Sequence, residues 1–225
     1  MEPFDPLAVE NVGVTLAVEL LEQPMHELPP SSSFAGAGVY ALYYTGSHPA
    51  YTELLDLDGT GGRKYPVYIG KAVRENAKQG FDPGPTTRAK IWERLGQHSE
   101  SIRAVEKAGN DPDLRLTDFY CRYLVLNDAY ITLAESVLIA TFRPAWNGMG
   151  FGSKVVGGER MTGRPSLWDS LHPGRGGRPA GTAERGQLAR EKIAESVERL
   201  SAAPTDQRLA KMLRKIRRYH AESTE

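Results

Sequence analysis

Two short apolar runs, residues 38–46 (GVYALYYTG) and residues 65–71 (YPVYIGK), constrain the fold of this chain most strongly. Each run mixes β-branched and aromatic residues and is bounded by glycine, which is typical of a β-strand. Because side chains alternate along a strand, Tyr40 is expected on one face of the sheet and Val39 on the other. If the two strands pair, Tyr40 and Tyr68 lie side by side. Core packing is one role for these tyrosines, and a shared site is the alternative.

Periodicity and helix-breaking residues predict the other elements. Apolar residues recur at helical spacing before Pro24, around Ile91 and Leu95, and between a cap at Asn127 or Asp128 and the break at Pro144. An alternating run before that cap predicts a third strand. The ranges are residues 7–23, 87–105 and 127–143 for the helices, 114–126 for the strand, and 183–200 and 205–220 for two helices near the end of the chain.

These elements predict an α+β fold with a small mixed or antiparallel three-stranded sheet flanked by helices, an N-terminal helix and a C-terminal helical, Arg-rich extension. The segment between the first helix and the first strand is expected to be an extended linker. Residues 46–64 and 72–86 form long inserts, and the first can hold a helical turn at residues 51–55. We expect residues 1–150 to form the core and residues 151–225 an arm with C-terminal helices, within the same compact unit.

The charge distribution is uneven although the formal net charge is zero. All 28 Lys and Arg residues lie at or after Arg63, whereas the first 62 residues contain nine Asp and Glu residues. Such a split is typical of a chain with a basic face for a polyanion, and evenly solvated helices are the alternative. The C-terminal run RLAKMLRKIRRYH is strongly basic, so it can either hold DNA or form an outer face.

Composition indicates a soluble globular protein. No apolar run approaches the roughly 18 residues of a membrane-spanning helix, and the start, MEPFDP, lacks the pattern of a signal peptide. The single cysteine, Cys121, lies in an expected strand and is expected to be a buried thiol. We therefore expect a cytoplasmic protein without membrane contact.

Three polar residues lie where they can form a site. Arg94 and His98 are four residues apart in an expected helix, so they project from neighbouring turns of one face. Glu135 lies among small and apolar residues of the next helix, where carboxylates seldom occur without a partner. Each has an ordinary alternative, because Arg and His are common on helix surfaces and Glu135 can lie on a solvated stripe.

An ordered set of positions resembles the GIY-YIG nuclease superfamily. Two tripeptides match the motifs that name it, with valine for the usual isoleucine in the first. A helix follows with Arg and His four residues apart, then a helix with one essential glutamate, and then an asparagine. The matching positions are Gly38-Val39-Tyr40, Tyr68-Ile69-Gly70, Arg94, His98, Glu135 and Asn147. The order of strands and helices predicted above also agrees with this superfamily.

The resemblance implies hydrolysis of a phosphodiester bond. In this family the tyrosine at the position of Tyr40 positions the attacking water and takes its proton, helped here by His98 and, as a second helper, Lys71. Because the pKa of a free phenol is about 10, nearby cations or a hydrogen-bonded base must favour its deprotonation. Cleavage leaves 3′-hydroxyl and 5′-phosphate ends without a covalent enzyme intermediate.

The other matched residues receive roles from the same resemblance. Arg94 would contact the nonbridging phosphate oxygens, and Tyr68 would position water and phosphate. Glu135 would be the main protein ligand of one divalent cation per site, most simply Mg²⁺, with water and DNA oxygens as further ligands. Asn147 would orient the region that carries the metal. No nucleotide cofactor is implied.

The inserts and the Arg-rich arm further resemble dimeric type II restriction endonucleases, in particular enzymes that cut the palindrome CCGCGG. A two-fold homodimer would place one site on each strand of double-stranded DNA. Arginine can bind guanine O6 and N7, so the arm is expected to contact DNA, and a disordered linker is the alternative. The residues expected to contact DNA are Lys154, Arg160, Arg164, Arg175 and Arg178.

Three other functions stay open at the level of sequence. A structure-specific or homing-type nuclease with the same core usually carries a second module such as a set of zinc ligands, and the one cysteine and five scattered histidines form no such cluster in the sequence. A DNA-binding protein on an inactive scaffold would have no reason to keep all catalytic positions together. A protein-interaction scaffold would show no salt-sensitive binding to DNA.

Overall fold

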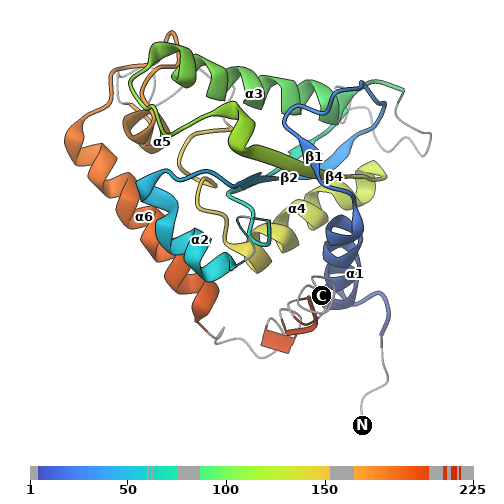
Figure 1. Ribbon diagram of the computed structural model, residues 1–225. Helices are drawn as coiled ribbons and strands as arrows, with labels where there is room; N and C mark the ends of the chain where they lie inside the picture. The colour runs from blue at the N-terminus through green and yellow to red at the C-terminus, as the bar shows by residue number, and fades with distance from the viewer. Residues whose placement is uncertain are drawn as a thin grey trace.

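The computed structural model describes residues 5–59, 61, 63–74, 87–152 and 165–202, together with residues 210, 211, 214–216 and 218 near the end of the chain. Its architecture is α+β, with one antiparallel sheet that helices cover on both faces (Figure 1). None of the described helices is both long enough and apolar enough to cross a membrane.

The sheet has four strands in the order β1-β4-β2-β3, and all three pairings are antiparallel. The strands are β1 (His26–Glu27), β2 (Gly38–Tyr44), β3 (Tyr68–Ala72) and β4 (Phe119–Val125). The prediction of three strands was one too few, because β1 lies in the segment expected to be a linker and pairs with Tyr120 and Cys121 near the start of β4. A strand of two residues leaves no alternating pattern to detect. Strand β4 begins later than predicted because a 3-10 turn, Leu116–Asp118, precedes it.

Strand β2 separates two buried clusters, as its alternating side chains predicted. Tyr40, Leu42 and Tyr44 belong to one cluster, which contains Ile91 and Leu95 of helix α3 (Lys90–Ala108). Val39, Ala41 and Tyr43 belong to the other, which contains residues of α1 (Val9–Glu22) and α4 (Asp128–Phe142). Figure 1 shows the result, with α3 above the sheet and α4 and α1 below it. The sheet is therefore the middle layer of three.

Local signals explain where the helices begin and end. The Asn127 side chain accepts a hydrogen bond from the amide of Ala129, so it is the cap of α4 that the sequence predicted. Helix α4 ends at Arg143, a left-handed residue (φ 44°) before Pro144. Helix α3 ends at Gly109, whose φ of 68° suits glycine. Sequence periodicity and these caps together set the lengths of both helices.

The first insert and the segment after α4 build a third helical part of the molecule. The insert contains a 3-10 turn, Pro49–Tyr51, and helix α2 (Thr52–Asp58), so it is more helical than the single turn predicted. Helix α5 (Leu167–Leu171) lies in a stretch for which no long element was expected, and α6 (Ala183–Ser201) follows it. Trp146, Trp168 and Ile193 of this part belong to the same buried cluster as Tyr40.

Ile216, near the end of the chain, packs against α1. The helix predicted at residues 205–220 lies largely outside the described residues, but the described ones are helical and Ile216 is buried in the cluster that includes Leu16 and Leu20 of α1. Arg214 and Lys215 are exposed. Helix α1 carries several acidic residues and no basic ones, so opposite charges accompany this packing.

Candidate active site

Tyr40 and His98 form a buried pair on the face of the sheet that α3 covers. Strand β2 positions Tyr40, and α3 positions His98 one turn after Arg94. The Tyr40 hydroxyl lies 2.8 Å from His98 Nε2, and the two residues are 0% and 2% exposed. Tyr68 of β3 completes the group, with ring centroids 6.3 Å from Tyr40 and 5.1 Å from His98. The expected neighbourhood of the two tyrosines is confirmed.

Glycine at position 70 is required by this arrangement. Gly70 pairs with Tyr40 across β2 and β3, and a Cβ atom at position 70 would lie 2.5 Å from the Tyr40 hydroxyl. Real Cβ atoms do not approach so closely, so any larger residue would displace the phenol. The glycine of the second motif therefore leaves room for the tyrosine of the first.

The electrostatics of Tyr40 differ from the sequence-based expectation. Burial raises the pKa of its hydroxyl well above the ordinary value, and Tyr68 and Glu135 act in the same direction. The Arg94 guanidinium lowers the pKa of Tyr40 but does not offset the burial. Tyr40 is therefore a neutral phenol at rest, hydrogen-bonded to His98 Nε2. Deprotonation of this phenol must rely on the hydrogen-bonded histidine, because the nearby cation alone is insufficient.

Arg94 lies at the mouth of this group. Its Nη1 atom donates to Gln97 Oε1 at 2.9 Å, and its Nη2 atom donates to the carbonyl of Gly152. Phe151, in the same segment as Gly152, stacks on His98 with centroids 4.8 Å apart. The segment after α4 thus forms a wall against both catalytic candidates of α3.

A cavity of about 370 Å³ opens beside Arg94 and His98. Phe151, Arg175 and Arg178 are among its other lining residues, and none of the lining residues that the structure describes is acidic. Because Arg175 is already ion-paired, Arg94 and Arg178 supply most of the positive charge of this surface, which suits an anion such as a phosphodiester. This cavity is the best candidate for the position of the scissile phosphate.

A second cavity, of about 360 Å³, lies between the end of α4 and α6. It also contains basic residues, but Glu195 within it forms ion pairs with Lys192 at 2.7 Å and with Arg199. Neither Tyr40 nor His98 lines it. Because it lies apart from this pair, the second cavity is a weaker candidate for the phosphate that would be hydrolysed.

The five residues expected to contact DNA fall into three groups. Arg175 is buried, and its guanidinium stacks on Trp168. Its Nε atom donates to Asp169 Oδ1 at 2.6 Å, and its Nη1 atom donates to the Phe151 carbonyl at 3.1 Å. It is therefore better explained as a support for the wall than as a DNA contact. Arg178 lines the cavity of Arg94. The other three, Lys154, Arg160 and Arg164, lie outside the described residues.

Glu135 has the partner that its apolar surroundings suggested. Its Oε2 atom lies 2.8 Å from Lys71 Nζ, and Lys71 Nζ also lies 3.5 Å from Thr132 Oγ1, one turn earlier on α4. Glu135 is 21% exposed in its side chain and close enough to affect Tyr40 and Tyr68 electrostatically. A half-buried carboxylate beside a hydroxyl is a suitable oxygen donor set for a hard cation that keeps several waters. Glu135 thus fits the role of main metal ligand.

Asn147 acts on β3 directly. Its Oδ1 atom accepts from the Ile69 amide at 2.9 Å, and its Nδ2 atom donates to the Ile69 carbonyl at 2.8 Å. Because β3 is an edge strand, these bonds satisfy the backbone groups on its open side. Asn147 therefore fixes the strand that carries Tyr68 and Lys71, whereas the resemblance had suggested an effect on the metal-bearing region.

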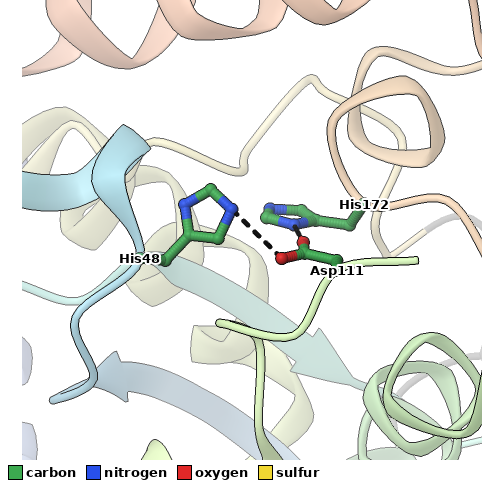
Figure 2. A group of neighbouring side chains, drawn as sticks. All are labelled: His48, Asp111 and His172. Atoms are coloured by element: carbon green, nitrogen blue, oxygen red, sulfur yellow. Dashed lines mark hydrogen bonds and ion pairs between the residues drawn. The ribbon is translucent and has the colours of Figure 1, made fainter. Parts of the chain in front are cut away.

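A buried group of His48, Asp111 and His172 was missed by the sequence analysis (Figure 2). Their ligand atoms lie within 4.8 Å of one another, so by composition and spacing the group is a candidate metal site. The histidines are scattered in the sequence, and only the fold brings these segments together. No spacing signal could have revealed the group.

Hydrogen bonds account for the nitrogens of this group without a metal. His48 Nδ1 accepts from the Ala50 amide at 3.1 Å, which leaves the proton on Nε2, 3.4 Å from Asp111 Oδ1. His172 Nδ1 lies 2.5 Å from Asp111 Oδ2, and its Nε2 atom lies 2.5 Å from the Tyr51 hydroxyl. Metal binding through His48 Nε2 would need the other tautomer, whose Nδ1 proton would oppose the Ala50 amide. The group is better explained as a polar network that joins α2, the end of α3 and α5.

This network predicts a loss of stability in acid. Burial lowers the pKa of His172 to about 4, and although burial alone would raise the pKa of Asp111, hydrogen bonds from His172 and His48 hold it well below its usual range. Because the unfolded chain binds a proton at His172 near pH 6.5 and the folded chain does not, the free energy of unfolding decreases as pH falls from about 6.5 to 4, by roughly 2 to 3 kcal/mol. Urea unfolding across this range measures it.

The matched control for this prediction is His172→Gln, which removes the titrating group. This variant is expected to show a shallower pH dependence between pH 6.5 and 4, and EDTA is expected to leave the unfolding midpoint of the unmodified protein unchanged. An equal slope in both proteins, or a large EDTA effect, would contradict this view of the network.

The sheet, the Tyr40–His98 pair, the adjacent Arg94 and the carboxylate of Glu135 are consistent with the core of a GIY-YIG nuclease. Comparison with protein families gives the same class: residues 32–201 match the family described as the Eco29kI GIY-YIG domain. The chain belongs to this family of restriction endonucleases, so by class it is a site-specific deoxyribonuclease. No curated protein matches the chain in a sequence search.

Proposed function

We propose that this protein is a Mg²⁺-dependent type II restriction endonuclease that cuts double-stranded DNA at a short, GC-rich palindrome. The observation that carries the proposal is the cavity beside Arg94 and His98, which lies next to the hydrogen-bonded Tyr40 and whose described lining contains arginines and no acidic residue. A phosphodiester in this cavity would lie against the groups that hydrolysis needs: a proton relay, a guanidinium and, from α4, a metal ligand.

The Tyr40–His98 pair would move the proton of the attacking water. The water oxygen attacks phosphorus in line with the 3′ oxygen, and its proton passes to the Tyr40 oxygen while the phenol proton passes to His98 Nε2. This concerted relay avoids a free phenolate, which the burial of Tyr40 disfavours. The bond to the 3′ oxygen breaks, the 3′ oxygen takes a proton from solvent, and the phosphate stays on the 5′ end.

Charge on the phosphoryl group would be opposed from two sides. Arg94 can exchange its contacts with Gln97 and Gly152 for the nonbridging oxygens. Glu135 would hold the Mg²⁺ ion, which supplies Lewis-acid stabilisation of the developing negative charge. Tyr68, fixed by the Asn147 clamp on β3, would orient the water.

Recognition of the target would depend on residues outside this site. Arg178 on the cavity rim is placed to follow the backbone of a bound strand, and Lys154, Arg160 and Arg164 belong to the arm proposed to reach base edges. A homodimer on a palindrome would place one Tyr40–His98 pair on each strand. CCGCGG is the first sequence to test.

Digestion of a large mixed-sequence DNA with Mg²⁺, followed by sequencing of the fragment ends, tests the proposal. Discrete fragments that end at one palindrome with 5′-phosphates are expected. Nicks confined to branched structures would instead indicate a structure-specific nuclease. Tight DNA binding without cutting would indicate a DNA-binding protein on this scaffold, and either of these results would overturn the proposal.

A further inference from the structure

Lys71 lies where a metal ion would be expected to bind. Its ammonium nitrogen lies 2.8 Å from Glu135 Oε2 and 3.5 Å from Thr132 Oγ1, so two oxygens from one turn of α4 face a single positive charge. These are the kinds of ligand that Mg²⁺ and Mn²⁺ prefer. In the protein without DNA, the Lys71 ammonium group is therefore the cation that pairs with these two oxygens.

A second described carboxylate, Asp128, lies at the start of α4, and its Oδ2 atom lies 3.3 Å from Arg74 Nε. Each of these two carboxylates thus has its own cationic partner. A metal ion held by Glu135 must either displace the Lys71 ammonium or bind beside it against electrostatic repulsion. Both possibilities weaken metal binding for as long as the ion pair exists.

We propose that Lys71 keeps Glu135 from binding the metal until DNA is present. The inference rests on the proposed function, since it assigns the metal to Glu135 and a phosphodiester to the neighbouring cavity. A bound phosphate offers Lys71 a second anion, because its partner Glu135 lies close enough to Tyr40 and Tyr68 to act on both electrostatically, although Lys71 itself is on the α4 side of β3. When the ammonium moves to the phosphate, the carboxylate becomes available to the metal.

This exchange makes metal and DNA bind with positive coupling. The free protein binds metal weakly, and DNA raises the metal affinity because it removes the competing ammonium. By linkage, metal raises the affinity for DNA by the same factor. A nuclease with this coupling holds little metal at Glu135 when no DNA is bound. Lys71 is in this sense a positioning residue that acts through Glu135.

The test measures Mn²⁺ binding to the protein alone by electron paramagnetic resonance of free Mn²⁺, and then repeats it with a DNA duplex. Lys71→Met is expected to bind Mn²⁺ about fivefold or more tightly than the unmodified protein without DNA, since a cation in direct contact with the ligand is gone. The increase in affinity on adding DNA should shrink in this variant. Glu135→Gln in the Lys71→Met background should restore weak binding.

Lys192→Met is the matched control, because Lys192 also forms an ion pair, with Glu195 Oε2 at 2.7 Å, on a different helix. It is expected to bind Mn²⁺ like the unmodified protein. Equal Mn²⁺ affinities for Lys71→Met and Lys192→Met, or tighter binding that Glu135→Gln does not remove, would overturn the inference. The titration of protein alone does not depend on cutting, so its outcome is separate from that of the digestion experiment.

Discussion

Replacing Glu135 by glutamine is expected to reduce strand cleavage by about 10³-fold or more while leaving the fold and DNA binding in place. Glutamine has nearly the same shape but lacks the charge that holds the metal, and Lewis-acid stabilisation contributes several kcal/mol to the barrier. The cost in folding stability should be small, because the ion pair with Lys71 is partly exposed. Single-turnover cleavage rates, with gel-shift binding in Ca²⁺, measure both effects.

Glu195→Gln is the appropriate control for this substitution. Glu195 likewise forms ion pairs with basic neighbours, Lys192 and Arg199, but it lies on α6 beside the second cavity. The Glu195→Gln protein is expected to cleave DNA at the rate of the unmodified protein. A Glu135→Gln protein that cuts within tenfold of the normal rate would show that the metal is held elsewhere.

Replacing Tyr40 by phenylalanine is expected to cause a loss of similar size, about 10³-fold in the single-turnover rate. The ring remains to fill the core between β2 and α3, but the hydroxyl that orients the water and relays its proton is removed. Stability should fall by only about 1 to 3 kcal/mol, since His98 Nε2 loses one buried partner. Cleavage rates and urea unfolding of the same preparation separate the two effects.

Tyr43→Phe offers a control three residues away on the same strand. Tyr43 is as buried as Tyr40 but faces α1 and α4, where its hydroxyl accepts a long hydrogen bond, 3.5 Å, from Arg122. Removal of the Tyr43 hydroxyl should leave the cleavage rate close to that of the unmodified protein. Similar rates for the two variants would mean that Tyr40 serves packing alone.

The alternation of β2 shows what the sequence could predict. Because side chains on a strand alternate, GVYALYY predicted that Tyr40 and Val39 lie on opposite faces of the sheet, and pairing with the second run predicted that Tyr40 lies near Tyr68; both are observed. The four-residue spacing of Arg94 and His98 predicted one helix face in the same way. Local periodicity sufficed because these inferences needed one helix or one pair of neighbouring strands.

The parts that were missed depend on contacts between distant segments. The two-residue strand β1 exists only because β4 offers an open edge. The contacts of Arg175 with Asp169 and the carbonyl of Phe151 could not be predicted from an Arg-rich stretch. The group of His48, Asp111 and His172 and the raised pKa of Tyr40 likewise arise from burial, which no short motif encodes.

The most direct test of this account is a crystal structure of the Glu135→Gln protein bound to a duplex that contains its cleavage site. The account predicts the scissile phosphate in the cavity beside Arg94 and His98, with its oxygens about 3 Å from the Arg94 guanidinium and the Tyr40 hydroxyl. A phosphate bound in the cavity between α4 and α6, with the Tyr40–His98 pair left without substrate, would contradict it.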